Sequence, residues 1–191
     1  MVVTDSLTGQ LLIAAPGVLE DPNFRRTVVL LLEHGEQGAL GVVLNRPSET
    51  PVLDPFPGWD DVTTAPSVLF MGGPVSQQMI IALAKPHPGL APDGWHQVLD
   101  GDLGRLGTVD LSRGPFDLAT GLDQLRVFAG YAGWSGGQLE GEIDAGAWFV
   151  VEAEPYDAFS SDPDRLWRDV LRRQGGSTAY YANYPADPSW N

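Results

Sequence analysis

The chain has 191 residues, a formal net charge of −14 and no cysteine. This length fits one domain with a sizeable core, and the lack of cysteine excludes disulfides, thiolate metal sites and a thiol nucleophile. The acidity argues against nucleic acid as a partner, because nucleic-acid backbones are bound by clustered Lys and Arg. The first residues lack a secretory signal pattern, and no apolar stretch approaches the ~20 residues of a membrane span. We therefore expect a soluble, cytoplasmic protein that contacts neither nucleic acid nor membrane.

Three short apolar segments predict strands near the start of the chain. They cover residues 10–15, 27–32 and 39–44. Runs of this length that are rich in Val, Leu and Ile, without polar alternation, are typical of strands covered on both faces. The intervening residues 34–38, H-G-E-Q-G, form a short glycine-bounded loop, so the second and third strands should make a hairpin.

The middle of the chain is less regular. Residues 48–66 contain four prolines and no clear periodicity, which predicts an irregular excursion with a helical turn near Asp60. Further strands are expected at residues 68–71, 79–84, 95–99 and 106–109, with a turn at 100–102 and a short helix at 115–122.

The stretch from about 125 to 152 predicts a β-α-β unit. Residues 125–133 and 148–151 are apolar runs of strand length, and Gly146 marks the break between the helix and the second strand. A helix between two apolar strands favours a parallel, right-handed crossover.

The start of that helix carries two local signals. Ser135 and Gln138 have the spacing of a capping box, in which the hydroxyl accepts from a backbone N–H and the amide reaches back. Trp134 and Leu139 have the spacing of a hydrophobic staple. The sequence therefore predicts that Ser135 caps the helix.

The last helix has the clearest amphipathic pattern. Asp162 is a candidate N-cap, Pro163 suits the first helical position, and Gly175 stops the helix. The apolar face consists of Leu166, Trp167, Val170 and Leu171.

The C-terminal tail, 177–191, is aromatic and interrupted by proline. Exposed aromatic side chains are unusual, so we expect the tail to fold back over an apolar groove or to contact a partner subunit. We divide the chain into an α+β domain at 1–176 and this tail.

Residues 133–137, G-W-S-G-G, match the G-x-S-x-G nucleophile elbow between a strand and a helix. Hydrolases that use this elbow have the order Ser, acid, His along the chain, but the three histidines, at 34, 87 and 96, all precede Ser135. We therefore assign no catalytic residue. The histidines also lack metal-ligand spacing, so no metal site and no cofactor are expected, and His34 is interpreted as a hydrogen-bonded turn residue.

Two glycine-rich turns are candidates for binding an anion through backbone N–H groups. The hypothetical ligand-binding residues are Asn45, Arg46, Gly72, Gly73, Ser135, Gly136, Gly137 and Gln138. Arg46 is the nearest cationic candidate. The alternatives are that the glycines serve tight packing and that Arg46 pairs with a surface carboxylate.

Several motifs together resemble the AlgH/YqgE family, over a span from Gly9 to about Leu171. They are G-Q-L-L-I-A-A-P (9–16), D-P-N-F-R-R-T-V (21–28), E-H-G-E-Q-G-A-L-G-V-V-L-N-R-P (33–47), G-G-P-V (72–75) and G-Y-A-G-W-S-G-G-Q-L-E-G-E-I (130–143). The resemblance implies one cytoplasmic α+β domain with a mixed, partly barrel-like β-sheet and flanking helices. It brings no catalytic residues, because the family is largely uncharacterised and its label as a transcriptional regulator comes from the genetics of alginate production.

The sequence favours a non-enzymatic regulatory or binding module that acts through protein contacts or a small anionic ligand. The alternative is a small-molecule enzyme with its site near the glycine-rich turns. The protein partner and the oligomeric state stay open.

Overall fold

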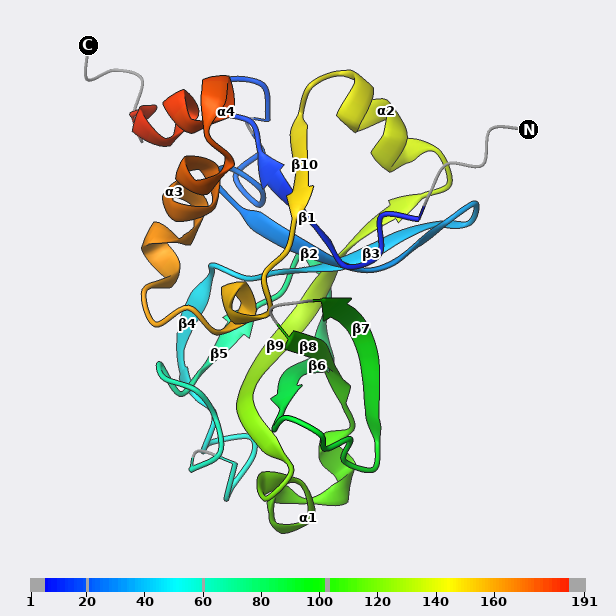
Figure 1. Cartoon of the computed structure of the whole chain (residues 1–191), viewed down its shortest axis with the longest axis vertical. Helices are drawn as coiled ribbons and strands as arrows, with labels where there is room; N and C mark the ends of the chain where they lie inside the picture. Colours follow the sequence, from blue (N-terminus) through cyan, green and yellow to red (C-terminus); the bar gives the residue numbers. More distant parts are fainter. Residues whose placement is uncertain (1–5, 20, 60, 102–103, 186–191) are drawn as a thin grey trace.

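The computed structural model describes residues 6–19, 21–59, 61–101 and 104–185. Within them, ten strands form one open sheet (Figure 1). The strands are β1 (Gln10–Ala14), β2 (Val28–Gly35), β3 (Gly38–Val43), β4 (Pro47–Pro51), β5 (Val68–Met71), β6 (Val75–Pro86), β7 (Trp95–Gly101), β8 (Gly104–Val109), β9 (Leu122–Ser135) and β10 (Trp148–Glu152).

The helices lie around this sheet (Figure 1), which confirms the expected α+β domain. They are η1 (Leu111–Arg113), α1 (Pro115–Ala119), α2 (Gln138–Asp144), η2 (Pro155–Phe159), α3 (Pro163–Gln174), α4 (Gly176–Tyr180) and η3 (Tyr181–Asn183). No helix in the described ranges is long and apolar enough to cross a membrane.

The sheet is mixed, and the long strand β9 joins its two halves. The order is β10-β1-β2-β3-β9-β6-β8-β7, and β5 pairs with β9 and carries β4 at its other side. The β5–β9 pair is parallel, whereas the other pairs are antiparallel. In Figure 1, β9 runs from the region of α2 to the opposite end, where α1 lies.

The β-α-β unit is present as the succession of β9, α2 and β10. The two strands are not neighbours, because β1, β2 and β3 lie between them in the sheet. The four antiparallel pairings along this path give β9 and β10 the same direction.

The sheet is covered on both faces around β1, as the continuous apolar runs predict. Leu11 and Ile13 of β1 share a core cluster with Trp167 of α3. Leu12 and Ala14 of the same strand share a second cluster with α2 and the end of β9. Successive side chains of a strand point to opposite faces, so α3 and α2 cover opposite sides of β1.

The prediction of an irregular segment at 48–66 is wrong at its start. Residues 47–51 form β4, which pairs with β5 at Pro47–Phe70 and Pro51–Val68. β4 has β5 as its one partner among the described strands, and proline is tolerated on such an edge because it removes no ladder donor there. The expected helical turn near Asp60 and the end of the expected turn at 100–102 lie outside the described residues.

The capping box predicted at Ser135 is also wrong. Ser135 is the last residue of β9, and α2 begins after Gly137, whose φ of 77° places it in the left-handed region. The Ser135 hydroxyl donates to Oε1 of Gln138 at 3.2 Å, and the same oxygen accepts from the Ser135 N–H at 3.1 Å. Of the two hydrogen bonds of a capping box, only the one between the Gln138 side chain and the Ser135 N–H is formed. The left-handed glycine shifts the helix start by two residues, so the Ser135 hydroxyl does not cap it.

Helix α3 has the expected bounds and buries the expected apolar face, but it is not the last helix, because α4 and η3 follow it. Asp162 occupies the N-cap position, but its side chain makes no capping hydrogen bond, contrary to the prediction. The described part of the tail folds back on the domain. Ala182 is buried in the main core, and the Tyr181 ring lies 5.2 Å from the ring of Phe149.

Candidate functional site

The residues of the hypothetical ligand site fall at two separate places along β9. Gly73 packs against Tyr131 and Ala132, where an added Cβ would lie 2.1 Å from the Tyr131 carbonyl carbon. Ser135 lies three residues beyond Ala132, which is roughly 10 Å along a strand. The candidate residues around Arg46 and those around Ser135 therefore have different surroundings. We call these two groups the Arg46 end and the Ser135 end of the hypothetical site.

The Ser135 end forms a closed hydrogen-bond network. Gln138 Nε2 donates to Oε1 of Glu142 at 3.1 Å. The other carboxylate oxygen of Glu142 accepts from the indole N–H groups of Trp134 at 2.9 Å and Trp148 at 2.8 Å. Gly136 packs so closely that a Cβ would lie 2.5 Å from the Glu36 carbonyl oxygen. These groups organise the turn between β9 and α2.

His34 is hydrogen-bonded, as expected. Its side chain is 3% exposed, Nδ1 accepts from the Leu7 N–H at 3.1 Å, and Nε2 lies 3.0 Å from Glu140 Oε1. Because Nδ1 accepts, the proton is on Nε2 and is donated to Glu140. No group of three or more His, Asp or Glu side chains that could hold a metal occurs in the part of the chain that the structure describes.

At the other end, Asn45 supports the turn that precedes β2. Its buried side chain accepts from the Val28 N–H at 2.9 Å and donates to the Arg26 carbonyl at 2.9 Å. Arg26 has a φ of 57°, a conformation that non-glycine residues rarely adopt. Asn45 thus positions the backbone that carries Arg25 and Arg26.

Gly72 and Gly73 allow three strands to meet beside this turn. The Gly72 N–H donates to the Ala129 carbonyl at 2.8 Å, and its carbonyl accepts from the Val43 N–H at 2.8 Å. Both backbone groups of Gly72 are therefore used within the fold.

A cavity of about 230 Å³ opens next to Arg46. It is lined by Pro22, Asn23, Val43, Arg46, Met71, Gly73, Pro74 and Gln77. Its lining residues include one arginine and two residues with side-chain amides, Asn23 and Gln77, whose N–H groups are hydrogen-bond donors of the kind that suits an anion.

Arg46, which lines this cavity, belongs to a group of four arginines that are related by charge interactions. We call Arg25, Arg26, Arg46 and Arg168 the arginine cluster. A guanidinium nitrogen of Arg46 donates to the Arg25 carbonyl. Burial, followed by the charges of Arg168, Arg25 and Arg46, lowers the pKa of Arg26.

Burial likewise lowers the pKa of Arg46. The neighbouring charge of Asp164 raises this pKa, and that of Arg25 lowers it. The cluster holds four of the eleven Lys and Arg residues of the chain. These like charges act on one another within a strongly acidic protein.

Arg26 is held in a fixed orientation. Its guanidinium carbon lies 4.4 Å from the centroid of the Trp167 ring, and Nη1 donates to the Tyr184 carbonyl at 3.2 Å. Arg168 follows Trp167 on α3. The sequence offered one signal for this cluster, the adjacent pair Arg25–Arg26, whereas the approach of Arg168 depends on how α3 packs.

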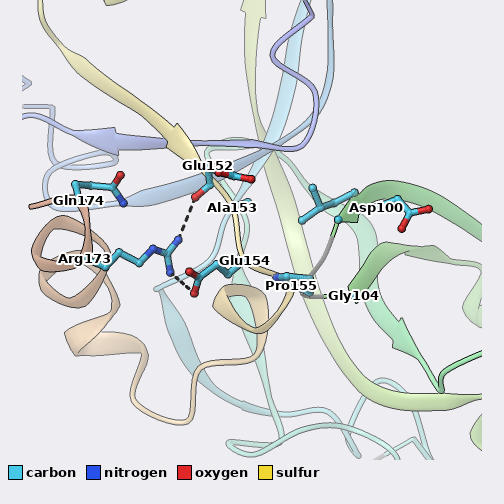
Figure 2. A pocket seen from close by; sticks show the side chains of 10 residues that line it. Asp100, Gly104, Glu152, Ala153, Glu154, Pro155, Arg173 and Gln174 are labelled. Atoms are coloured by element: carbon cyan, nitrogen blue, oxygen red, sulfur yellow. Dashed lines mark hydrogen bonds and ion pairs between the residues drawn. The ribbon is translucent and has the colours of Figure 1, made fainter.

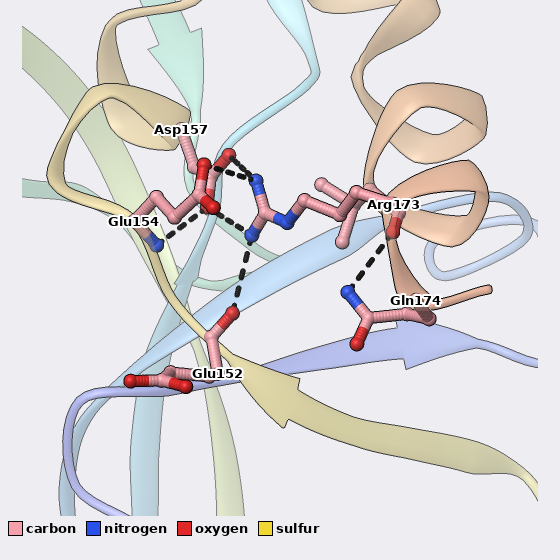
Figure 3. Close-up of polar contacts among 6 residues, drawn as sticks. Glu152, Glu154, Asp157, Arg173 and Gln174 are labelled. Atoms are coloured by element: carbon pink, nitrogen blue, oxygen red, sulfur yellow. Dashed lines mark hydrogen bonds and ion pairs between the residues drawn. The ribbon is translucent and has the colours of Figure 1, made fainter.

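A larger cavity, of about 490 Å³, lies between the β7–β8 hairpin and the segment from β10 to α3 (Figure 2). It was not predicted from the sequence. Its cation, Arg173, donates to both carboxylate oxygens of Asp157 at 2.6 Å and to Glu154 at 3.1 Å (Figure 3). The Glu152 carbonyl accepts a further bond from Arg173 at 3.1 Å.

These contacts compensate the positive charge of Arg173, the arginine of the large cavity. Burial acts to lower the pKa of Arg173, but the hydrogen bonds and charge of Asp157 and the charge of Glu154 raise it above its usual value. Asp100 and Glu152 add two more carboxylates to the lining (Figure 2). The large cavity therefore has an acidic wall and does not suit an anion.

The chain has close relatives and solved structural neighbours. It is 52% identical over 195 residues to a UPF0301 protein of Streptomyces avermitilis, covering 100% of this chain and 98% of that one. A UPF0301 protein of Thermobifida fusca is 50% identical over 191 residues, covering 97% and 96% of the two chains.

A crystal structure of a Corynebacterium diphtheriae protein superimposes with a TM-score of 0.86 at 33% identity, covering 93% of this chain and 92% of that one. The solution structure of the AlgH protein from Pseudomonas aeruginosa gives a TM-score of 0.67 at 29% identity, covering 98% of both chains. The model of the AlgH-like family matches residues 11–179. The chain therefore belongs to the AlgH-like family, as its motifs predict.

Proposed function

We propose that this protein is a non-enzymatic binding module that holds a small anion in the cavity beside Arg46. One observation carries the proposal: Arg46 lines a cavity in a chain whose net charge is −14, and it interacts electrostatically with Arg25 and Arg26. Arginine is well suited to anions, because its planar group donates two parallel hydrogen bonds to a carboxylate or phosphate.

The lining supports this chemistry. Arg46 supplies charge, and the side-chain amides of Asn23 and Gln77 can donate to further oxygens of the anion. The charge of Asp164 acts on Arg46 and raises its pKa, whereas burial and the charge of Arg25 lower it. A bound anion would relieve the repulsion within the cluster.

The Ser135 end supports a non-enzymatic role. The Ser135 hydroxyl donates to Gln138, and Gln138 in turn donates to Glu142. Since a serine nucleophile requires a neighbouring base that accepts its proton, this arrangement lacks the geometry of an activated nucleophile.

The test is a titration of the purified protein with phosphate, sulfate and citrate at constant ionic strength, followed by calorimetry and thermal shift. Wild type should bind at least one of them, and Arg46→Gln should weaken that binding at least tenfold. Arg172→Gln is the matched control, because Arg172 is a half-exposed arginine of α3 that pairs with Asp169 at 3.8 Å. It should bind as wild type does.

Gln77→Ala provides a second variant that leaves the Arg46–Arg25 contact intact. It should weaken binding several-fold without a change in stability, because Gln77 is exposed. The proposal fails if none of the anions binds, or if Arg46→Gln binds as tightly as the control.

A further inference from the structure

We propose that a cleft between the β2–β3 hairpin and strands β6, β7 and β8 binds a small amine, with its apolar body inside and its ammonium group paired with Glu33 (Figure 1). The cleft has a volume of about 390 Å³, within the range of roughly 300–1,000 Å³ that is usual for small-molecule sites. Among the described residues it shares no lining residue with the cavity beside Arg46. Amine binding here does not depend on the proposed anion site.

The register of the strands places polar side chains of both walls on the cleft side. In the hairpin, Glu33 pairs with Leu40, and cross-strand partners point to the same face of a sheet. Leu40 packs against the main core cluster, so Glu33 lies on the face that is turned toward it. In the opposite wall, Thr108 pairs with both Leu83 and His96, and Leu83 belongs to the same core cluster. Glu33 therefore faces the cleft from one wall, and Thr108 and His96 face it from the other.

Most of the lining is apolar. The apolar lining residues are Leu32, Leu40, Ile80, Ile81, Ala82, Val98 and Val109. Part of this surface is open to water, since Ile80 is 37% exposed and the preceding Met79 is 47% exposed. Exposed apolar surface rimmed by polar residues is typical of ligand-binding grooves. An apolar ligand body that covers Ile80 removes this surface from water, which favours binding.

The polar lining determines the charge of the ligand. It consists of Glu33, His96, Gln97 and Thr108, and no Lys or Arg among the described residues lines the cleft. The exposed Glu33 side chain forms no ion pair or hydrogen bond within the part of the chain that the structure describes. An unpaired carboxylate attracts a cation and repels an anion, and it does so more strongly beside an apolar wall than in bulk water. The cleft therefore favours an ammonium group over a neutral or anionic one.

The experiment compares n-hexylamine, 1-hexanol and hexanoate, which share one apolar body and differ in the charge of the head group. Each is titrated into the isotope-labelled protein at pH 7.5 and constant ionic strength, and binding is followed by NMR. We expect hexylamine to bind at least fivefold more tightly than hexanol and at least tenfold more tightly than hexanoate. The backbone amide signals of Gln97 and Thr108 should shift during the hexylamine titration.

Two carboxylates of the same hairpin give a matched pair of variants. Glu33→Gln should reduce the hexylamine affinity to about that of hexanol and leave the hexanol affinity unchanged. Glu36→Gln removes the same charge from the exposed turn of the hairpin, outside the lining, and should change the hexylamine affinity less than twofold. Ile80→Ser should weaken hexylamine and hexanol by the same factor, about threefold, because it removes a contact to their common body.

Three outcomes would overturn the amine site. Hexylamine may fail to bind, hexanoate may bind as tightly as hexylamine, or Glu33→Gln and Glu36→Gln may weaken hexylamine equally. The last result would show that the net charge of −14 attracts the cation without a specific site. Anion binding beside Arg46 is measured separately, so failure of the amine site leaves the proposed function standing.

Discussion

Arg173 and Arg46 both border a cavity, but their neighbours give them opposite electrostatic surroundings. Arg173 donates to Asp157, Glu154 and the Glu152 carbonyl, and its pKa is raised. The pKa of Arg46 is lowered, because burial and the charge of Arg25 outweigh the charge of Asp164, which raises it. The same residue type is thus a structural tie in one region and a candidate binding group in the other.

The difference shows why cavity volume alone is a poor guide to function. The cavity at Arg173 is larger, about 490 Å³ against about 230 Å³, but the charge of its arginine is already compensated within the fold. At the smaller cavity, Arg46 donates to a backbone carbonyl, that of Arg25, and we propose that this leaves it a role in binding a ligand. The following predictions test this contrast, from the largest effect to the smallest.

Asp157→Ala should lower the free energy of unfolding by about 3 kcal/mol, because it leaves the Arg173 charge without its main partner. The Asp157 side chain is 3% exposed and also accepts from the Glu154 N–H at 2.8 Å. Urea unfolding measures the change. Asp169→Ala is the control, since its pairs with Arg165 and Arg172 are half-exposed and should matter by less than about 1 kcal/mol. Equal losses in the two variants would contradict the structural role of Asp157.

Arg126→Met tests a buried arginine whose partners are carbonyls. Arg126 is 1% exposed and donates to the carbonyls of Ala158, Ser160 and Ala65. The variant leaves three acceptors without their donor, so we expect a loss of about 2 kcal/mol at pH 8, measured by urea unfolding.

Burial lowers the pKa of Arg126 to about 10, which adds a pH dependence. Above that pH the folded wild type releases the proton, whereas the unfolded chain, in which the arginine pKa is higher, still keeps it. The stability of wild type relative to Arg126→Met should therefore rise between pH 9 and 11, by at most about 1.4 kcal/mol per pH unit. If the stability difference between wild type and Arg126→Met stays constant or falls over this pH range, burial does not disfavour the charged form of Arg126.

Arg168→Gln should stabilise the protein slightly, by a few tenths of a kcal/mol, because it removes repulsion on Arg26. The gain should be measurable as a higher melting temperature at low salt and should vanish at about 0.5 M NaCl, where exposed charges are screened. Arg172→Gln should show no such gain, since Arg172 pairs with Asp169. A loss of stability in Arg168→Gln at low salt would contradict a repulsive cluster.

Ser135→Ala gives the baseline for a polar residue outside both arginine regions. The hydroxyl does not cap α2, so the loss in urea unfolding should stay within about 0.5 kcal/mol, rather than the ~1 kcal/mol of a lost cap. A larger loss would mean that the bond to Gln138 contributes more than its exposed position suggests.

Patterns spanning a few residues could be predicted well. The apolar runs at 10–15 and 27–32 became β1 and β2, and the apolar face of α3 is buried as expected. The errors occurred where a local pattern depends on its surroundings. Pro47 and Pro51 fit in a strand because β4 is an edge strand, and the left-handed Gly137 displaced the helix start from Ser135.

The candidate site was only partly predictable. Arg46 and Gly73 were identified from a turn and a glycine pair, and both line the smaller cavity. Asn45 and Gly72 make hydrogen bonds within the fold, and Ser135 to Gln138 lie at the end of β9, in the following turn and at the start of α2. Arg25, Arg26 and Arg168 were missed because no sequence spacing relates them to Arg46.

The sequence by itself determined most of the strands, helix α3, the net charge and the family. These properties depend on composition and on neighbours within a few residues. Only the tertiary structure decided which arginines are compensated, because the interaction of two charges depends on their distance and burial, and folding brings together groups far apart in the chain. Arg173 pairs with carboxylates of η2 and its flank, whereas Arg46 donates to the Arg25 carbonyl and lies near the opposing charges of Asp164 and Arg25.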